Sequence, residues 1–388
     1  MTPVLAQNSF QPNLEELLSA IVRGEASSWS PSGRSEFQAD FLEACVTHGV
    51  APLIYKQLSQ TSAWEDWPPG IRAALESLAI RQASLQLLLE RELISVLESL
   101  AERGVQALIL KGTALAYTHY PFLGLRPRND TDLLIHPKDI SLTEKVLAEL
   151  GFKRLHMVSG RFIMHQCMYA KEDGHGIPHV YDIHWKISNP LLFADILSYN
   201  ELASRAIPLH ALGEHARALD PAHALLLACV HRVAHHQNSD CLIWLYDIHL
   251  LVSQMKPEEH EAFAKLAIDK RLRTICAAGL RLAQHRFSTP LPVDLMETLQ
   301  EDNNPLLGEA TASFLKPYQQ RIDVLLSDLR TLARWRDKLQ LLKEHVFPPA
   351  DYILNHYPTA SRAMLPGLYV HRALQGACKF WNREAVKS

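Results

Sequence analysis

The sequence predicts a mostly helical α+β protein, in which a small mixed sheet is flanked by helical sections on both sides along the chain. Glycine is scarce, with 16 residues in 388, about 4% against the roughly 7% of average proteins, whereas all-β and Rossmann-type chains need many glycine turns. Apolar residues recur at helical spacing near both ends of the chain. Short apolar runs typical of strands are confined to the region between about residues 105 and 187.

The charge balance excludes several classes of protein. Lysine and arginine total 39 against 42 aspartates and glutamates, which gives a net charge of -3, and the chain is 21% charged and 47% hydrophobic. These values are near the globular average. They argue against a disordered chain, a strongly basic nucleic-acid-binding surface and an acidic tail. The length allows two or three domains.

The first predicted section, residues 1–104, is helical. Apolar residues repeat every three or four positions over 14–24, 34–58 and 72–104. Gly104 is a suitable residue to end the last of these helices. Because this section has few chemically distinctive side chains, we expect it to support the rest of the fold.

The middle section, residues 105–188, is predicted to form the small α/β core. Its pattern is strand, helix, strand, helix and then three further strands, separated by turn-rich segments. The predicted strands are 105–110, 130–136, 153–157, 161–171 and 178–187, and the predicted helices are 111–120 and 136–152.

The third section, residues 189–388, is again helical, with no apolar run near the roughly 18 residues that span a bilayer. The six cysteines show no CxxC pair or close spacing, which indicates reduced thiols and a cytoplasmic protein without membrane attachment. The predicted helices of this third section are 220–237, 241–255, 258–287, 330–347 and 365–381.

A pair of carboxylates carries the chemistry of the middle section. Asp130 and Asp132 flank Thr131 at the start of an apolar strand, and the period of a strand points both side chains to one face. Asp182 and His184 repeat this spacing in a later strand. If the two strands pair, three carboxylates converge and offer oxygen ligands for Mg²⁺. The alternatives are a salt bridge for Asp182 and simple packing of His184 beside Trp185.

Upstream of these acids, the sequence predicts a phosphate-binding turn. Lys111, Gly112 and Thr113 follow the first strand and open a helix, where glycine allows close approach and free N–H groups attract an anion. Arg126 and Arg128 precede the acids and are suited to neutralise a triphosphate or pyrophosphate. Lys111 either contacts phosphate or extends along the strand end into solvent. Together the acids and cations suit metal-assisted phosphoryl or nucleotidyl transfer.

The segment around these residues resembles a known family. It reads ILKGTALAYTHYPFLGLRPRNDTDLLIHPKD and is similar to the KG-x-x-LA-x-x-x-YP…LR-x-x-x-D-x-DLLV signature of an uncharacterised bacterial nucleotidyltransferase family, within the polymerase-beta-like superfamily. The segments 221–252, 347–358 and 365–374 resemble later parts of the same family. In the superfamily pattern, Gly112 and Thr113 match the glycine turn, and Asp130 and Asp132 match the pair of metal ligands. Asp182 matches the third carboxylate of that pattern. Features of the narrower family are matched by Lys111, Arg126, His184 and Trp185.

The resemblance implies transfer of a nucleoside monophosphate from a nucleoside triphosphate to a hydroxyl acceptor, with release of pyrophosphate. It implies Mg²⁺, or Mn²⁺, as the cofactor, and it leaves the nucleotide, the acceptor and the oligomeric state open. The near-neutral charge favours a small molecule or a protein over tRNA as acceptor. The alternative is a catalytically silent nucleotide sensor or partner-binding member of the same fold, with its acids separated or blocked by Arg126 or Arg128.

Histidines in the third section suggest further candidates. His231 and His235 have the spacing of zinc ligands on one helix face, followed by His236. Arg232 stands where the zinc-protease motif has glutamate, which argues against a metal there. We expect this helix to line the cleft or to pack on Asp247. His231, Arg232 and Asp247 are therefore second-tier candidates for the acceptor side of the active site. Arg128 and His184 are second-tier candidate site residues within the α/β core. The basic stripe over 330–343 is predicted to be a solvated face rather than an RNA contact.

Overall fold

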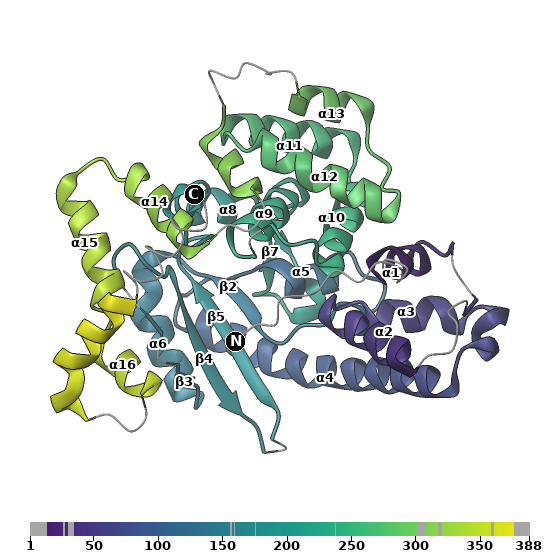
Figure 1. Ribbon diagram of the computed structural model, residues 1–388, viewed down its shortest axis with the longest axis horizontal. Helices are drawn as coiled ribbons and strands as arrows, with labels where there is room; N and C mark the ends of the chain where they lie inside the picture. The colour runs from purple at the N-terminus through teal and green to yellow at the C-terminus, as the bar shows by residue number, and fades with distance from the viewer. Residues whose placement is uncertain are drawn as a thin grey trace.

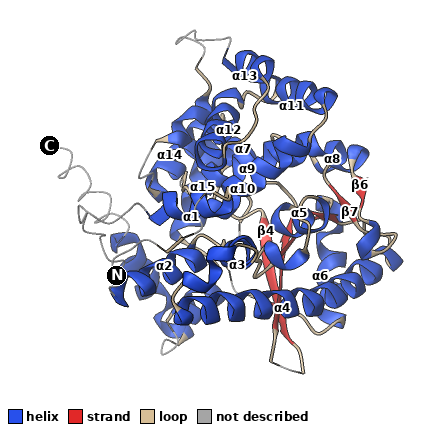
Figure 2. Ribbon diagram, turned by 90° about the vertical axis from the view of Figure 1, so that its right-hand side faces the viewer, coloured by secondary structure: helices blue, strands red, loops and turns tan. Residues whose placement is uncertain are grey.

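The computed structural model shows a mixed sheet between helical layers (Figure 1). It describes residues 14–25, 28–29, 35–155, 157–158, 160–174, 176–236, 238–300, 308–316, 320–357 and 361–375. Figure 2, from the side, shows helices around the strands on both faces. The predicted mostly helical α+β class is therefore correct.

The sheet has seven strands in the order β3-β4-β5-β2-β1-β7-β6. The β2–β5 and β1–β7 pairs are parallel, and the other pairs are antiparallel. β6 and β7 were not predicted, because each has only two residues and lacks a strand pattern in the sequence. The strands are β1 Leu108–Ile109, β2 Thr131–Leu134, β3 Lys153–Arg154, β4 Gln166–Glu172, β5 Pro178–His184, β6 Ile207–Pro208 and β7 Arg217–Ala218.

Four α-helices precede the sheet within the part of the chain that the structure describes. The single helical run expected over 34–58 is two helices, because the chain turns at Gly49, whose φ of 68° is left-handed. In Figure 1 the long α4 runs across the lower right part of the molecule, and the ends of β4 and β5 reach below it. The helices are α1 Leu14–Val22, α2 Ser35–Thr47, α3 Ala51–Ser59 and α4 Pro69–Glu102.

The remaining helices follow or interrupt the strands. The run expected over 258–287 is also broken, at Arg271, which has a φ of 56°. Residues 365–375 are helical, and the rest of the last predicted helix lies outside the described residues. The helices are α5 Lys111–Thr118, α6 Ile140–Glu149, α7 Leu191–Ala194, α8 Tyr199–Arg205, α9 Pro221–Ala234, α10 Leu242–Gln254, α11 Pro257–Asp269, α12 Arg273–Phe287, α13 Val293–Gln300, α14 Arg321–Thr331, α15 Trp335–Val346 and α16 Ala350–His356.

Alternate residues of the central strands join two separate apolar cores. Ile109 and Leu133 pack with the end of α4 and with α6. Leu108 and Leu134 instead join the large core that contains α9 and α10. Because side chains alternate across a strand, Asp132 lies on the same face as Leu134. The two cores therefore determine that the acids face the C-terminal helices.

Within the described ranges, no helix has the length and apolar character needed to cross a bilayer. The five described cysteines are free thiols. The sixth, Cys378, lies outside the described residues.

Candidate active site

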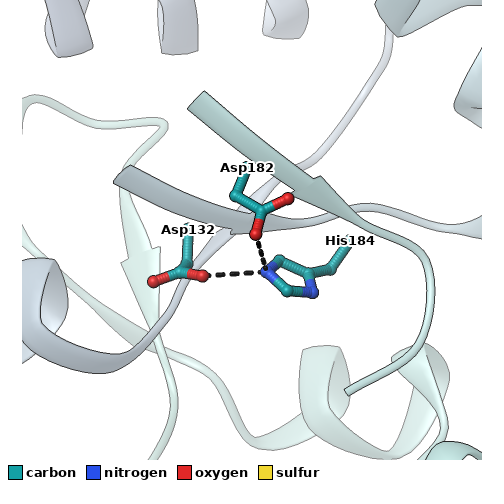
Figure 3. A group of neighbouring side chains, drawn as sticks. All are labelled: Asp132, Asp182 and His184. Carbon is teal, nitrogen blue, oxygen red and sulfur yellow. Dashed lines mark hydrogen bonds and ion pairs between the residues drawn. The ribbon is translucent and has the colours of Figure 1, made fainter. Parts of the chain in front are cut away.

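The parallel pairing of β2 with β5 brings the predicted acids together. Its register places Asp132 opposite Asp182 and Leu134 opposite His184. Ligand atoms of Asp132, Asp182 and His184 all lie within 4.8 Å of one another. As Figure 3 shows, one ring nitrogen of His184 faces both carboxylates; Nε2 is 2.8 Å from Oδ1 of Asp132 and 3.4 Å from Oδ2 of Asp182. We call these three residues the acid cluster.

The acid cluster is buried and its members shift one another's protonation. Asp132 and Asp182 are 8% and 6% exposed, and His184 is fully buried. Burial opposes the charge of Asp132, but Lys111 and His184 outweigh it and hold the pKa of this carboxyl well below its usual range. Burial and the charge of Lys111 oppose protonation of His184, but the two aspartates raise its pKa. The contact between Asp132 and His184 therefore favours a carboxylate beside an imidazolium.

Lys111 adds a second cation to the acid cluster. Its Nζ is 2.6 Å from Oδ1 of Asp132. It is the first residue of α5, separated from β1 by Leu110 alone, and its φ of 52° is left-handed. A side chain other than glycine adopts this conformation at a cost of about 1–3 kcal/mol, and such strain concentrates at functional sites. The start of α5 is thus held in an unfavourable conformation with its ammonium against the acids.

The acid cluster has a donor set that fits a divalent cation. Oδ1 of Asp182 is buried and has no hydrogen-bond partner, while its Oδ2 accepts a hydrogen bond from Gln166. A buried carboxylate oxygen without a donor is costly, and a bound cation would satisfy it. Two carboxylates suit Mg²⁺ or Mn²⁺, and the imidazole is also accepted by Mn²⁺.

Asp130 lies beside this group but is not one of its members. It precedes β2 and its side chain is exposed. Desolvation by the surrounding protein, followed by repulsion from Asp132, raises the pKa of Asp130. Its predicted role as a metal ligand stays a prediction.

Gly112 is packed against the guanidinium of Arg126. A Cβ at Gly112 would lie 2.9 Å from Cζ of Arg126. Nε and Nη2 of Arg126 donate to Oδ1 and Oδ2 of Asp247 at 2.8 and 2.7 Å, and Nη1 donates to the carbonyl of Pro127. Tyr120 also donates its hydroxyl to Asp247. Each nitrogen of Arg126 thus has an acceptor, while its predicted contact to nucleotide stays a prediction.

Arg128 contacts the hydroxyl of the predicted phosphate turn. Its Nη1 donates to Oγ1 of Thr113 at 3.0 Å and to Oγ1 of Thr131 at 3.1 Å, and its Nε donates to Gln86 on α4. Burial lowers the pKa of this guanidinium, and Nη2 has no hydrogen-bond partner. The alternative of a catalytically silent protein expected Arg126 or Arg128 to block the acids of the site. In the structure Arg126 binds Asp247 and Arg128 binds Thr113 and Thr131 instead.

Three histidines lie at the C-terminal end of α9 and are called the α9 histidines: His231 in its last turn, His235 at its C-cap and His236 directly after it. His231 and His236 approach each other at 3.0 Å between their Nε2 atoms, and His236 stacks on Trp244. Burial, followed by the charge of Lys111, lowers the pKa of His235 to about 3 and that of His236 to about 4. Burial and Lys111 also hold the pKa of His231 well below its usual value.

The second-tier residues Arg232 and Asp247 pair with groups other than these histidines. Arg232 is fully buried, with Nη1 at 3.8 Å from Asp240. Asp247 pairs with Arg126 as described above. Among the described residues, the acid cluster is the group of at least three side chains whose ligand atoms lie close enough to hold a metal ion. The α9 histidines do not belong to such a group.

Sequence reasoning missed the residues that hold the candidate site in place. Gln166 binds Asp182, Gln86 binds Arg128, and Tyr120 binds Asp247. Gln166 carried a weak signal, because it is a polar residue in an otherwise apolar strand pattern. Gln86 and Tyr120 carried none, since each lies in a helical pattern far along the chain from its partner.

The site is a buried carboxylate pair on two parallel strands, next to a helix that begins shortly after a neighbouring strand, and the sequence match gives the class of protein to which this site belongs. The chain belongs to the family described as uncharacterised nucleotidyltransferase, which it matches over residues 35–288. No curated protein matches it in sequence. An antigenic nucleotidyltransferase-like protein from Paracoccidioides brasiliensis matches 55% of this chain and 97% of its own, at 12% identity and a TM-score of 0.31. So loose a superposition adds nothing to the family assignment, which depends on the sequence match.

Proposed function

We propose that this protein is a metal-dependent nucleotidyltransferase that moves a nucleoside monophosphate from a nucleoside triphosphate to a hydroxyl acceptor. The observation that carries the proposal is the meeting of Asp132 and Asp182 around the unpaired Oδ1 of Asp182. Membership of the nucleotidyltransferase family supports it. The acceptor in this proposal is a small molecule or a protein.

Asp132 and Asp182 would hold Mg²⁺ or Mn²⁺, with Asp130 as a further ligand from the start of β2. The ion, when bound, stabilises charge on the attacking and leaving oxygens. The acceptor oxygen forms a bond to the α-phosphorus while the bond from that phosphorus to the bridging oxygen breaks. Pyrophosphate leaves with the bonding electrons, and the hydroxyl proton passes to the carboxylate of Asp182.

The start of α5 would bind the β- and γ-phosphates. Gly112 brings the backbone close to the anion, and the first N–H groups of the helix point toward it. The ammonium of Lys111, which is paired with Asp132, would move from this carboxylate to a phosphate oxygen when the nucleotide binds. Arg126, packed against Gly112, supports the turn from behind, and Arg128 fixes the hydroxyl of Thr113.

A catalytically silent nucleotide sensor is the second candidate. One observation favours it: Lys111 and His184 already contact the same oxygen of Asp132. In a silent protein these two cations would stay in place, and the nucleotide would bind without being cleaved.

Titration with Mn²⁺, followed by electron paramagnetic resonance, tests the site directly. Wild-type protein should bind Mn²⁺ and, with it, at least one nucleoside triphosphate, and α-³²P-labelled nucleotide should label an acceptor in a cell extract. Asp132→Asn should lose Mn²⁺-dependent binding and labelling. Asp139→Asn removes a carboxylate from the same core outside the acid cluster and should change neither.

The outcomes separate the candidates. Metal-dependent nucleotide binding without labelling or pyrophosphate release favours the sensor. Absence of Mn²⁺-dependent nucleotide binding in the wild-type protein contradicts both.

A further inference from the structure

A chain of three hydrogen bonds ends on the carboxylate of Asp182. The backbone N–H of His165 donates to Oδ1 of Asn189 at 2.7 Å. Nδ2 of Asn189 donates to Oε1 of Gln166 at 3.0 Å. Nε2 of Gln166 then donates to Oδ2 of Asp182. We call Asn189 and Gln166 the amide relay, because together they connect the acid cluster to the backbone just before β4.

The sheet places both amides of the relay. Gln166 is the first residue of β4 and lies opposite His184 in the antiparallel pair with β5. Asp182 lies two residues from His184 on the same face of β5, so Gln166 reaches it as a diagonal neighbour across the two strands. Asn189 lies between β5 and α7. Both amides are half-buried.

The direction of the relay is fixed at its backbone end. An amide side chain has an oxygen that accepts and a nitrogen that donates, whereas a backbone N–H can only donate. Asn189 must therefore turn its oxygen to His165 and its nitrogen to Gln166. Gln166 gives its own oxygen to Asn189, which leaves its nitrogen for Asp182. One backbone N–H thus determines that a donor, and not a lone pair, meets the carboxylate.

This direction leaves one oxygen of Asp182 free. Oδ2 accepts from Gln166 and is 3.4 Å from Nε2 of His184, and the dashed line from His184 to Asp182 in Figure 3 ends on this oxygen. Oδ1 is buried and has no hydrogen-bond partner. If the Gln166 amide were reversed, its oxygen would repel Oδ2, and the carboxylate would lose the contact that holds it.

We propose that Gln166 and Asn189 are positioning residues for the metal ion, which hold Asp182 by Oδ2 so that Oδ1 is available as a ligand. This inference rests on the proposed function, because the ion is the one assigned there to Asp132 and Asp182. Gln166 acts through Asp182, and Asn189 acts through Gln166. Outer partners of this kind change metal affinity about 10–100-fold when they are removed.

Asn189→Asp tests the relay, because the direction of the relay and the added charge predict opposite results. The new carboxylate can still accept from the His165 N–H, but it has no N–H to donate to Gln166. The Gln166 amide should then reverse and present its oxygen to Asp182. Mn²⁺ affinity of the full chain, measured by electron paramagnetic resonance, should fall at least about tenfold. Added negative charge alone would instead raise the affinity for a cation.

A double-mutant cycle determines whether the effect passes through Gln166. Gln166→Ala removes the donor to Asp182 and should itself lower Mn²⁺ affinity. Asn189→Asp should cause no further loss in the Gln166→Ala background, because the amide that transmits its effect is absent. A merely structural role for Asn189 predicts equal losses in both backgrounds. Asn200→Asp, at an exposed residue of α8, adds the same charge outside the relay and should bind Mn²⁺ as the wild type does.

Two further measurements support the cycle. Circular dichroism melting establishes that each variant is folded, and if Asn189→Asp does not fold, Asn189→Ala takes its place and should lower Mn²⁺ affinity only where Gln166 is present. The side-chain amide signals of Gln166 in ¹⁵N NMR spectra, identified by their absence from Gln166→Ala, should shift in Asn189→Asp even without metal.

The outcomes separate the relay from the proposed function. A folded Asn189→Asp variant that binds Mn²⁺ as tightly as the wild type or more tightly overturns the relay, and so do equal losses in both backgrounds. The proposed function survives either result if the wild type binds Mn²⁺ and nucleotide and Asp132→Asn does not. Absence of Mn²⁺-dependent nucleotide binding in the wild-type protein overturns the proposed function, and the positioning role is then overturned as well, whether or not the Gln166 signals shift.

Discussion

Two groups of buried charges flank helix α5, and they differ in how fully their atoms are paired. Around Arg126 and Asp247, each guanidinium nitrogen has an acceptor, and Asp247 also accepts from Tyr120. In the acid cluster, Oδ1 of Asp182 and Nδ1 of His184 lack partners. A fully paired buried group holds elements together, whereas unpaired buried atoms are available to a ligand. The comparison separates residues that support the fold from those suited to chemistry.

Removing one member of the fully paired group should have the largest effect. Asp247→Ala leaves the charge of Arg126 buried without its partner, and it should lower the free energy of unfolding by about 3–5 kcal/mol, measured by urea denaturation. Asp195→Ala breaks the exposed pair with Lys186 and should cost less than about 1 kcal/mol. Equal losses in the two variants would contradict a supporting role for Asp247.

Gly112→Ala tests the contact between the phosphate turn and the paired group. The added Cβ would lie 2.9 Å from Cζ of Arg126 and would displace a guanidinium that is held by Asp247. We expect a loss of about 1–3 kcal/mol by the same measurement. Gly174→Ala places its Cβ in open space and should leave stability nearly unchanged. A neutral Gly112→Ala would show that Arg126 moves freely.

The α9 histidines should make stability depend on pH. The pKa values of His235 and His236 fall to about 3 and 4 in the folded protein, against about 6.5 unfolded. Between these values the unfolded chain binds more protons, so the free energy of unfolding should decrease as the pH falls from 6.5 toward 4. The slope is at most about 1.4 kcal/mol per pH unit for each proton.

Urea denaturation at several pH values measures this slope. His235→Gln should flatten it, whereas His215→Gln, at a largely exposed histidine, should not. An unchanged slope in His235→Gln would mean that burial and the charge of Lys111 do not lower the pKa of this histidine in the folded protein.

The partly paired acid cluster should show the smallest effect on stability. Oδ1 of Asp182 has no hydrogen-bond partner, and the amide oxygen of asparagine can still accept from Gln166, so Asp182→Asn should change the free energy of unfolding by less than about 1 kcal/mol. Its Mn²⁺ affinity should nevertheless fall at least about tenfold. If Asp182→Asn lowered the free energy of unfolding by several kcal/mol and still bound Mn²⁺, Asp182 would support the fold and would not be a metal ligand.

Local pattern was enough to predict the core of the fold. The strand–helix–strand order and the position of Lys111 at a strand–helix junction follow from apolar runs and turn residues. The prediction that the carboxylates converge required the strands of Asp132 and Asp182 to pair. These strands, β2 and β5, are neighbours in the sheet. The strands β6 and β7 had no detectable pattern, because their short segments become strands only through pairing with each other and with β1.

The partners of the arginines were beyond local pattern. Arg126 and Asp247 are 121 residues apart, and no spacing rule links a loop before β2 to the middle of α10. The same holds for Gln86 and Arg128. His184 was predicted as a second-tier residue because its spacing from Asp182 was visible, but its contact with Asp132 required the register of two strands.

The β2–β5 pairing also has a consequence for how the protein folds. Fifty residues separate Asp132 from its register partner Asp182, and parallel pairing over such a distance forms slowly, because a long loop must close first. The two carboxylates are therefore separate until the central sheet is complete. A metal ion that binds both of them stabilises only chains that have reached this stage, so its presence should slow global unfolding more than it accelerates the early steps of folding.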